Sequence, residues 1–387
     1  MTISTGDLGY WWHLVLATTP QPATPTVGRV VLIVGTRPES IKLAPIAEQL
    51  GDDAIVVHTG QHHSLAMIQP SRHGRTVTLP PLHPTSRGDQ LGRTITALDS
   101  LYARLRPQVV IVQGDTTSAV AGALAANTRN IPLVHVEAGL RSFDRSMPEE
   151  HNRILIDHLA DLCCAPTPLA VTHLQREGLP DRRIVLTGNP VVEAATHALP
   201  EMDRRLAILD EFGVGDNSYV LATIHRPENV DDDTNLTAIL HALAQSPLPV
   251  LLPVHPRLRS HLAPHTAMLV NTHVQLTTPQ PYPQLLALAQ HARLIVTDSG
   301  GLQEEATILK RPIIVVRRSN ERPEVEGKFG QRVTPTALLS ILSARINELH
   351  DVEYLKSIPS PYGDGNAAAR IAAATRHLRR MCSSESG

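Results

Sequence analysis

From Val30 onward, short apolar runs of strand length alternate with amphipathic stretches that have helical spacing. Runs with few polar residues indicate strands buried on both faces, and their alternation with helices is typical of a parallel sheet covered by helices. In the first half of the chain, strands are predicted at Val30–Val34, Ala54–His58, Val109–Gln113, Leu133–Val136, Leu162–Ala165 and Ile184–Leu186. This half is therefore predicted to form an α/β domain.

The alternation pauses after about residue 194 in a polar stretch and then resumes. Further strands are predicted at 219–224, 249–253, 274–276, Leu294–Thr297 and Ile313–Val316. Because 387 residues exceed one ordinary core, we predict two Rossmann-like domains with parallel sheets, at 29–194 and 195–365, with a cleft between them. Ligands of such sheets bind beyond the carboxyl ends of the strands, so residues at those ends are the first candidates for a site.

The two ends of the chain lie outside this pattern. Residues 1–28, which end in a proline-rich stretch, are predicted to form a flexible N-terminal extension. The apolar run at 10–17 contains His13, lacks a basic segment before it and is too short to span a bilayer. After a turn at 361–365, residues 366–387 are predicted as a helix that crosses back onto the first domain.

Charge and cysteine content limit the possible partners. With 35 basic and 37 acidic residues the chain is balanced, so neither nucleic acid nor a membrane is predicted as a partner, and recognition of a phosphate must be local. Cys163, Cys164 and Cys382 have no metal-ligand spacing, and the adjacent pair cannot bridge without strain. A reducing, cytoplasmic location is the prediction that fits.

The segment that follows Leu294–Thr297 carries the strongest chemical pattern, Asp298-Ser299-Gly300-Gly301-Leu302-Gln303-Glu304-Glu305. Glycines let a backbone approach a ligand closely, and the free N–H groups at a helix start can hold a phosphate. An ordinary strand-to-helix turn explains the glycines but not the carboxylates. We therefore predict that Ser299 and both glycines bind a diphosphate, and that Glu305 accepts a hydrogen bond from a sugar hydroxyl.

The first predicted strand is followed by Gly35-Thr36-Arg37-Pro38-Glu39, and Lys42 comes one turn into the next helix. Arg37 can bind a phosphate with both arms of its guanidinium group, and Lys42 adds a point charge. Both residues also suit a helix start with solvated charges. Their prediction as substrate-binding residues therefore depends on the diphosphate site of the second domain.

Two neighbouring strands of the first domain each end in a carboxylate, Asp115 and Glu137. Asp115 alternatively caps its helix, a frequent role of aspartate. Glu137 is harder to explain as structure, because a carboxylate directly after a buried strand is costly unless it is paired or used. Its predicted partners are His135 and Arg141. Asp115 and Glu137 are predicted to be catalytic.

The helix predicted to begin after Met147 opens with Glu149 and Glu150, and acids suit the positive end of a helix dipole. That explanation is sufficient for Glu150, whereas Glu149 is predicted as a third carboxylate of the cleft. Arg153, on the same helix, is predicted to bind substrate.

Histidines follow two predicted strands of the second domain, at His225 and His255. Positive charge at these strand ends would balance a departing diphosphate, so His225 is predicted to be catalytic and His255 to bind substrate. No cluster has the spacing of a metal site, and no Gly-x-Gly-x-x-Gly follows a strand, so neither a metal nor another cofactor is predicted.

Taken together, these segments resemble the non-hydrolysing UDP-N-acetylglucosamine 2-epimerase family across almost all of the chain after residue 29. The matching residues are Gly35-Thr36-Arg37-Pro38-Glu39, Gly60-Gln61-His62, Gly114-Asp115-Thr116-Thr117, His135-Val136-Glu137-Ala138-Gly139-Leu140-Arg141, Pro148-Glu149-Glu150, His225-Arg226, Pro253-Val254-His255, the segment 298–305 and the turn at 361–365.

The resemblance implies a GT-B-like arrangement of the two domains, a UDP-sugar in the interdomain cleft and a homodimer. It implies reversible 2-epimerisation of UDP-N-acetylglucosamine to UDP-N-acetylmannosamine, in which a carboxylate removes the C2 proton, UDP leaves to give a glycal, and UDP re-adds. Acid and base groups are needed on both faces of the sugar, a role that Asp115, Glu137 and Glu149 would fill. Arg37, Lys42 and His225 would stabilise the diphosphate, and Glu305 would bind the ribose.

The sequence departs from the family at Ser64, where many members have a glutamine that helps to bind an activating second UDP-N-acetylglucosamine, and at Leu285, where a phenylalanine is usual near the uracil. Three alternatives stay open: a hydrolysing epimerase that releases N-acetylmannosamine and UDP, a GT-B glycosyltransferase, and a UDP-sugar sensor without activity. The product could feed cell-surface glycans or an amino-sugar natural product such as an antibiotic.

Overall fold

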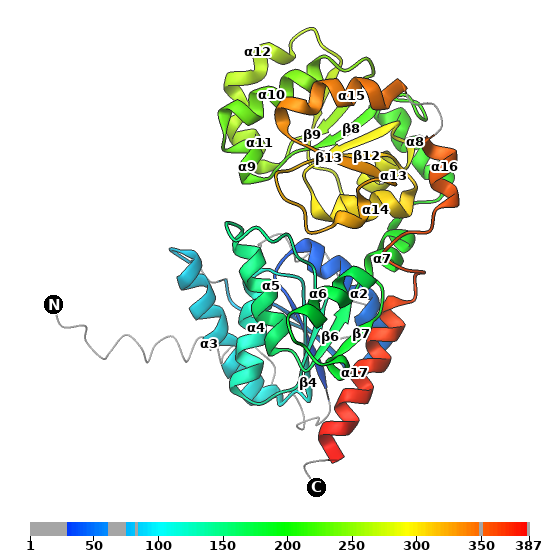
Figure 1. Ribbon diagram of the computed structural model, residues 1–387. Coiled ribbons are helices and arrows are strands. Elements are labelled where there is room, and N and C mark those ends of the chain that lie inside the picture. Colours follow the sequence, from blue (N-terminus) through cyan, green and yellow to red (C-terminus); the bar gives the residue numbers. More distant parts are fainter. Residues whose placement is uncertain (1–28, 61–74, 82–83, 348–350, 385–387) are drawn as a thin grey trace, which may run out of the picture.

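The computed structural model of the protein describes residues 29–60, 75–81, 84–347 and 351–384. Figure 1 shows two α/β domains stacked one above the other, each with a sheet between layers of helices. The predicted extension at 1–28 and Ser64 lie outside the described residues. None of the described helices is long and apolar enough to cross a membrane.

The first domain contains a seven-stranded parallel sheet in the order β3-β2-β1-β4-β5-β6-β7. Its strands are β1 Val30–Val34, β2 Ala54–His58, β3 Arg75–Thr78, β4 Val109–Gln113, β5 Leu133–Val136, β6 Leu162–Ala165 and β7 Ile184–Leu186. Its helices are α2 Arg37–Leu50, α3 Arg87–Leu105, α4 Thr117–Thr128, α5 Pro148–Leu159 and α6 Pro168–Arg176. All strands predicted for this domain are confirmed.

The second domain repeats this plan with a six-stranded parallel sheet in the order β10-β9-β8-β11-β12-β13. Its strands are β8 Val220–Thr223, β9 Val250–Pro253, β10 Val274–Thr277, β11 Leu294–Thr297, β12 Ile313–Val316 and β13 Gly330–Val333. Its helices are α8 Met202–Phe212, α9 Pro227–Val230, α10 Asp233–Ala244, α11 Pro256–His261, α12 Thr266–Leu269, α13 Tyr282–His291, α14 Gly300–Leu309, α15 Leu338–Asn347 and α16 Asp351–Ser357.

The sequence analysis missed the edge strands β3 and β13. Both are short and rich in polar residues, reading Arg-Thr-Val-Thr and Gly-Gln-Arg-Val, and most side chains of β3 are exposed. An edge strand needs no second buried face, so it lacks the continuous apolar run by which the central strands were recognised.

Successive side chains of a strand point to opposite faces, and both faces of the first sheet are buried. Val31 and Ile33 pack in the core under α3 and α4, whereas Val30 and Leu32 face a second core that includes Leu43 of α2. Both faces therefore need apolar residues, which explains why β1 reads Val-Val-Leu-Ile-Val without interruption.

The chain passes between the domains twice on one side of the molecule, through α7 (Val191–Ala198) and through the segment that leads into α17 (Ala367–Ser384) (Figure 1). The two passages touch where the Asn189 N–H donates to the carbonyl of Tyr362 at 2.8 Å. The final helix then packs on the first domain, where Ile371 is buried in the same core as Leu43. The boundary predicted at residue 194 falls inside α7.

Candidate active site

A cavity of about 270 Å³ lies between the domains, at the carboxyl ends of the strands. It brings together the predicted residues Arg37, Lys42, His225, His255, Ser299, Gly301 and Glu305. A larger hollow of about 1200 Å³ opens at the opposite end of the first sheet, where Gln108 precedes β4, and none of the predicted site residues lines it. The position at the strand ends and the lining chemistry favour the smaller cavity as the site.

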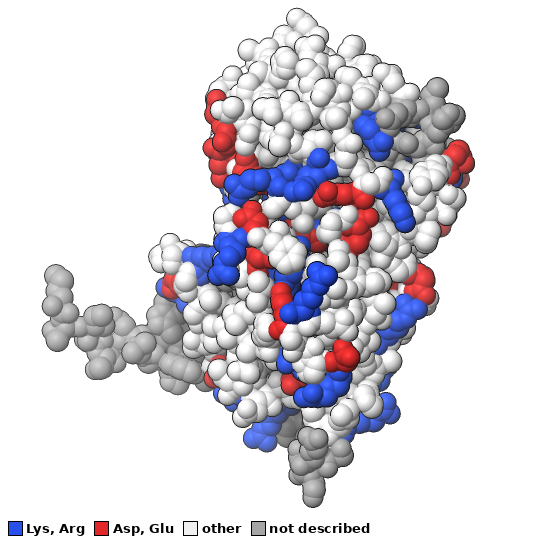
Figure 2. Space-filling model, in the orientation of Figure 1, with Lys and Arg blue, Asp and Glu red and all other residues white. Residues whose placement is uncertain are grey.

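Charged side chains gather where the two domains meet, whereas much of the visible face of the second domain is uncharged (Figure 2). Among the described residues, no group of three or more His, Cys, Asp or Glu side chains is placed to hold a metal ion.

The helix start at α14 has two glycines with different roles. Ser299 is the N-cap, and its hydroxyl accepts a hydrogen bond from the Leu302 N–H at 3.4 Å. A side chain at Gly300 would lie 2.6 Å from Nη1 of Arg322, so this glycine makes room for the arginine behind the helix. Gly301 instead lines the cavity, and a side chain there would meet only the Ser299 hydroxyl at 4.0 Å, so the positive end of the helix is open toward an anion in the cavity.

Glu305 lies at the edge of the same cavity and is held by one neighbour. The Tyr282 hydroxyl donates to Oε1 of Glu305 at 2.8 Å. Burial raises the pKa of Glu305, although the Tyr282 hydrogen bond opposes this effect. The Glu305 carboxylate is thus fixed in one orientation, as is required of a group that accepts a hydrogen bond from a ligand hydroxyl.

His225 is oriented by a buried carboxylate. Asp298 is fully buried and accepts hydrogen bonds from the backbone N–H groups of His225 and Arg226 and from the Asn229 amide. Nδ1 of His225 lies 3.0 Å from the same carboxylate, and the His255 ring is 5.2 Å away between centroids. Burial would raise the pKa of Asp298, but these donors lower it, so an anion fixes the imidazole from behind.

Four charged residues form a buried quartet beside the cavity. Nζ of Lys42 lies 2.7 Å from carboxylate oxygens of both Glu137 and Glu304. Arg322 reaches the same two carboxylates, at 3.0 Å and 2.7 Å. Lys42 and Glu137 belong to the first domain, Glu304 and Arg322 to the second. The quartet therefore joins the domains through one acid and one base from each.

The two acids of the quartet have pKa values shifted in opposite directions. Burial alone would raise the pKa of Glu137, but the charges of Lys42 and Arg322 outweigh burial and hold it below its usual range. Burial raises the pKa of Glu304, and the neighbouring Glu137 adds to this effect against the two cations. Acids whose pKa values are pushed apart in one site are typical of acid–base chemistry.

The predicted partners of Glu137, His135 and Arg141, are wrong. Both contact Asp157 instead, at 2.6 Å and 2.7 Å. Because β5 ends at Val136 and Glu137 has a φ of 70°, its side chain does not follow the alternation of the strand. Its further contacts are the amides of Gln113 and Asn189.

Asp115 does not cap helix α4, because Thr116 is the N-cap and its hydroxyl accepts from the Ala119 N–H at 3.0 Å. The Asp115 carboxylate pairs with the guanidinium group of Arg153, which also contacts Glu150 at 2.5 Å. Arg153 is thus held by two acids and is not among the residues that line the cavity.

Glu150 is buried and accepts hydrogen bonds from the backbone N–H groups of Ser142 and Phe143, as a structural role requires. Glu149 lies in the first turn of α5 and is half-buried, with no hydrogen bond or ion pair to other described residues. Its catalytic role stays a prediction.

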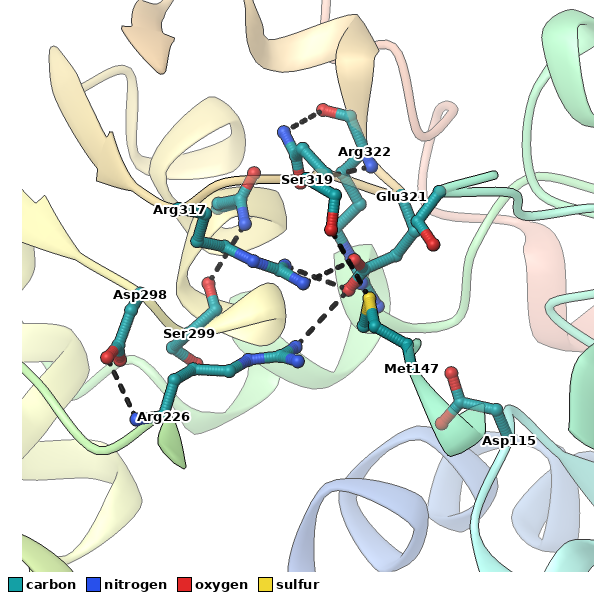
Figure 3. A network of polar contacts seen from close by, with 12 residues as sticks. Asp115, Met147, Arg226, Asp298, Ser299, Arg317, Ser319, Glu321 and Arg322 are labelled. Atoms are coloured by element: carbon teal, nitrogen blue, oxygen red, sulfur yellow. Dashed lines mark hydrogen bonds and ion pairs between the residues drawn. The ribbon is translucent and has the colours of Figure 1, made fainter. Parts of the chain in front are cut away.

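The sequence analysis missed the arginines that follow β12. Figure 3 shows Arg226, Arg317 and Arg322 pointing toward Glu321, which lies 2.7 Å from Arg317 and 3.5 Å from Arg226. Asp115 of the first domain lies across the gap from this network (Figure 3). Arg317 is the first residue after a buried strand, so the same rule that selected His225 would have selected this segment.

The structure thus consists of two Rossmann-like α/β domains in a GT-B-like arrangement, with cations, acids and a helix start converging on their cleft, where ligands of such folds bind. The model of the family described as UDP-N-acetylglucosamine 2-epimerase matches residues 46–376. The chain belongs to this family of epimerases.

Individual relatives agree with this assignment. A UDP-N-acetylglucosamine 2-epimerase of Methanocaldococcus jannaschii is 34% identical over 363 residues, which cover 89% of this chain and 97% of the relative. A crystal structure of Methanocaldococcus jannaschii UDP-GlcNAc 2-epimerase in complex with UDP-GlcNAc and UDP matches with a TM-score of 0.79 and 34% identity, covering 90% of this chain and 99% of that one. A UDP-2,3-diacetamido-2,3-dideoxy-D-glucuronate 2-epimerase of Pseudomonas aeruginosa is 33% identical over 362 residues, covering 89% and 98%.

Proposed function

We propose that this protein interconverts UDP-N-acetylglucosamine and UDP-N-acetylmannosamine by inversion at C2, without net hydrolysis. The observation that carries the proposal is the buried carboxylate of Glu137 beside Lys42, a cation that also lines the cavity. A glycosyltransferase needs no acid at this place that can reach the C2 proton. The relatives named for 2-epimerisation support the same reaction.

In the proposed complex, UDP occupies the second-domain side of the cavity. Ser299, Gly300 and Gly301 receive the diphosphate at the start of α14, and Glu305 accepts a hydrogen bond from the ribose. Arg37, Lys42, His225 and His255 stabilise the charge that develops on UDP as it leaves. The sugar then extends toward Glu137, Asp115 and Glu149.

The reaction is an elimination followed by an addition. A carboxylate takes the proton from C2, the electron pair forms the C1–C2 double bond, and the bond from C1 to the UDP oxygen breaks with its electrons on UDP. In the second step a carboxylic acid on the other face returns a proton to C2 while the UDP oxygen attacks C1. No water and no redox cofactor enter the balance, and acids on both faces of the ring suffice.

The ion quartet suggests how Glu137 becomes a base only when substrate is present. In the free protein Lys42 and Arg322 keep its pKa low, which makes it a weak base. A bound diphosphate offers Lys42 a further anion besides Glu137 and Glu304, and the Glu137 carboxylate then loses part of the positive charge that stabilises it. Its basicity rises in the complex in which it is needed.

A proton NMR time course with UDP-N-acetylglucosamine in deuterated water tests the proposal. Formation of UDP-N-acetylmannosamine with deuterium at C2 is the expected result. Free N-acetylmannosamine together with UDP would show a hydrolysing epimerase instead. No exchange at C2, followed by turnover only when an acceptor is added, would show a glycosyltransferase and refute the proposal.

The sugar and the assembly are tested separately. The diacetamido-glucuronate named for the Pseudomonas relative is the first alternative substrate to assay, since that relative is about as similar as the others. We also propose a homodimer, which light scattering coupled to size exclusion would show as twice the 42.1 kDa of one chain.

A further inference from the structure

The proposed catalytic loops have unusual backbone conformations. Glu137 has a φ of 70°, and Gly139, two residues on, has a φ of 82°. A side chain at Gly139 would clash with the carbonyl of Ala170. A left-handed conformation is costly for a non-glycine residue and persists only where the surroundings hold it. Contacts from neighbouring residues must therefore hold the loop that carries Glu137.

Asp157 of α5 is the centre of that support. It is fully buried, and its Oδ2 accepts hydrogen bonds from the Gly139 N–H at 3.1 Å and from Arg141 at 2.7 Å. Its other oxygen lies 2.6 Å from Nδ1 of His135. One carboxylate thus fixes the end of the Glu137 loop and orients a buried imidazole.

His135 extends this support to the neighbouring strand. Its Nε2 lies 2.9 Å from the carbonyl oxygen of Gly114, the residue before Asp115. A carbonyl oxygen can only accept hydrogen bonds, so Nε2 of His135 donates to Gly114, while Nδ1 contacts the Asp157 carboxylate. The loop that bears Asp115 is therefore held by the same pair of residues as the loop that bears Glu137.

Arg141 adds a further ion pair to this support. It contacts Asp157 and also pairs with Glu177 through two hydrogen bonds, at 2.7 Å and 2.5 Å. Asp157 is thus held by His135 through one oxygen and by Arg141 through the other. None of the four lines the cavity between the domains.

We propose that Asp157 and His135 are positioning residues, which fix the spacing of Asp115 and Glu137 by holding Gly114 and Gly139 from behind. The inference rests on the proposed function, because it assigns those two acids to the reaction. Misplacement of reacting groups by about 1 Å can lower turnover about 100-fold.

Two single variants and their combination test the proposal, with a matched control. In Asp157→Asn an NH2 group, which cannot accept a hydrogen bond, replaces one of the two carboxylate oxygens. In His135→Asn the shorter side chain cannot keep both contacts, to Asp157 and to the Gly114 carbonyl. His291→Asn is the control, because His291 is also buried and pairs with an aspartate, Asp216, at 2.8 Å, but lies outside the cavity. Active protein is counted by UDP binding, so that misfolded protein does not enter kcat.

We expect kcat to fall at least tenfold in Asp157→Asn and in His135→Asn, with the Kd of UDP changed less than about twofold. The double variant should be no worse than the poorer single variant by more than about threefold, since both act as one unit. His291→Asn should lose stability but keep kcat. Retention of kcat within threefold of wild type in both Asp157→Asn and His135→Asn would overturn the proposal.

Hydrogen exchange separates this inference from the proposed function. Peptides that cover 109–119 and 134–142 should exchange faster in His135→Asn than in His291→Asn, whatever the reaction is. Wild-type protein that turns over no epimerase substrate would refute the proposed function alone. Unchanged exchange at both loops would refute the support by Asp157 and His135.

Discussion

Replacement of Glu39 by glutamine should make the stability of the protein less sensitive to pH. Glu39 is almost fully buried at the start of α2, where its Oε2 accepts from the N–H groups of Gly35 and Thr36 and from the Thr36 hydroxyl. Its Oε1 lies 2.5 Å from the Thr116 hydroxyl. A glutamine can place its carbonyl oxygen on the three donors and its amide on Thr116, so the change removes a charge and little else.

The size of the effect follows from burial. Burial raises the pKa of Glu39 from its ordinary 4.5 to about 7, against four hydrogen bonds that lower it. The folded protein thus holds this proton more tightly than the unfolded chain. The associated stability is complete below the unfolded pKa and is lost as the pH rises through 7, and a difference of about 2.5 between the two pKa values corresponds to about 3 kcal/mol.

Urea unfolding of wild type and Glu39→Gln at pH 5, 6, 7 and 8 measures this effect. The free energy of unfolding of the variant should gain on that of wild type by roughly 2–3 kcal/mol between pH 5 and 8. Glu48→Gln, an exposed change on the same helix, controls for the loss of one negative charge. A difference between variant and wild type that stays constant with pH would refute the reasoning, because Glu39 would then be ionised in the folded protein as easily as in the unfolded chain.

Three further changes test the site. Glu137→Gln should lower kcat at least 100-fold while the protein still folds and binds UDP, and solvent exchange at C2 is the direct readout; normal exchange would remove Glu137 from the mechanism. Gly300→Ala should displace Arg322 and lower both stability and UDP affinity, whereas Gly301→Ala, whose side chain meets only the Ser299 hydroxyl at 4.0 Å, should spare stability; equal unfolding midpoints of the two variants would contradict this assignment. Tyr282→Phe should weaken UDP binding severalfold, because Glu305 loses the hydrogen bond that orients it, while kcat stays nearly unchanged. Calorimetric titration with UDP measures this, and equal affinities of variant and wild type would refute the role of Tyr282.

Sequence patterns predicted the fold well because both sheets are buried on two faces. That arrangement demands uninterrupted apolar runs, and every central strand has one. The polar edge strands β3 and β13 carry no such signal. The strand-end rule likewise located seven of the residues that line the cavity, since it follows from the topology of parallel sheets, whereas the predicted Asp115, Glu137, Glu149, Arg153 and Gly300 are not among the lining residues.

The partners of the site residues could not be predicted in the same way. Which cation faces Glu137 depends on how the two domains meet and on a left-handed turn at Glu137 itself, and neither is encoded in local periodicity. Arg322 comes from the other domain and 185 positions later in the chain. Such a pairing becomes visible only when the domains are placed against each other.

The double passage of the chain between the domains determines how the cleft can open. The two connecting segments lie on one side of the molecule and are joined by the hydrogen bond from Asn189 to Tyr362. Two linked connections resist twisting of one domain against the other, so we expect the domains to open by a hinge motion about a single axis. Distances between spin labels on α3 and α12 would then change together, as rotation about one axis requires. Distances that vary independently of one another would exclude a single hinge axis. The side-chain amide of Asn189 also donates to Glu137 of the first domain and Glu304 of the second. The hinge is therefore hydrogen-bonded directly to an acid of each domain.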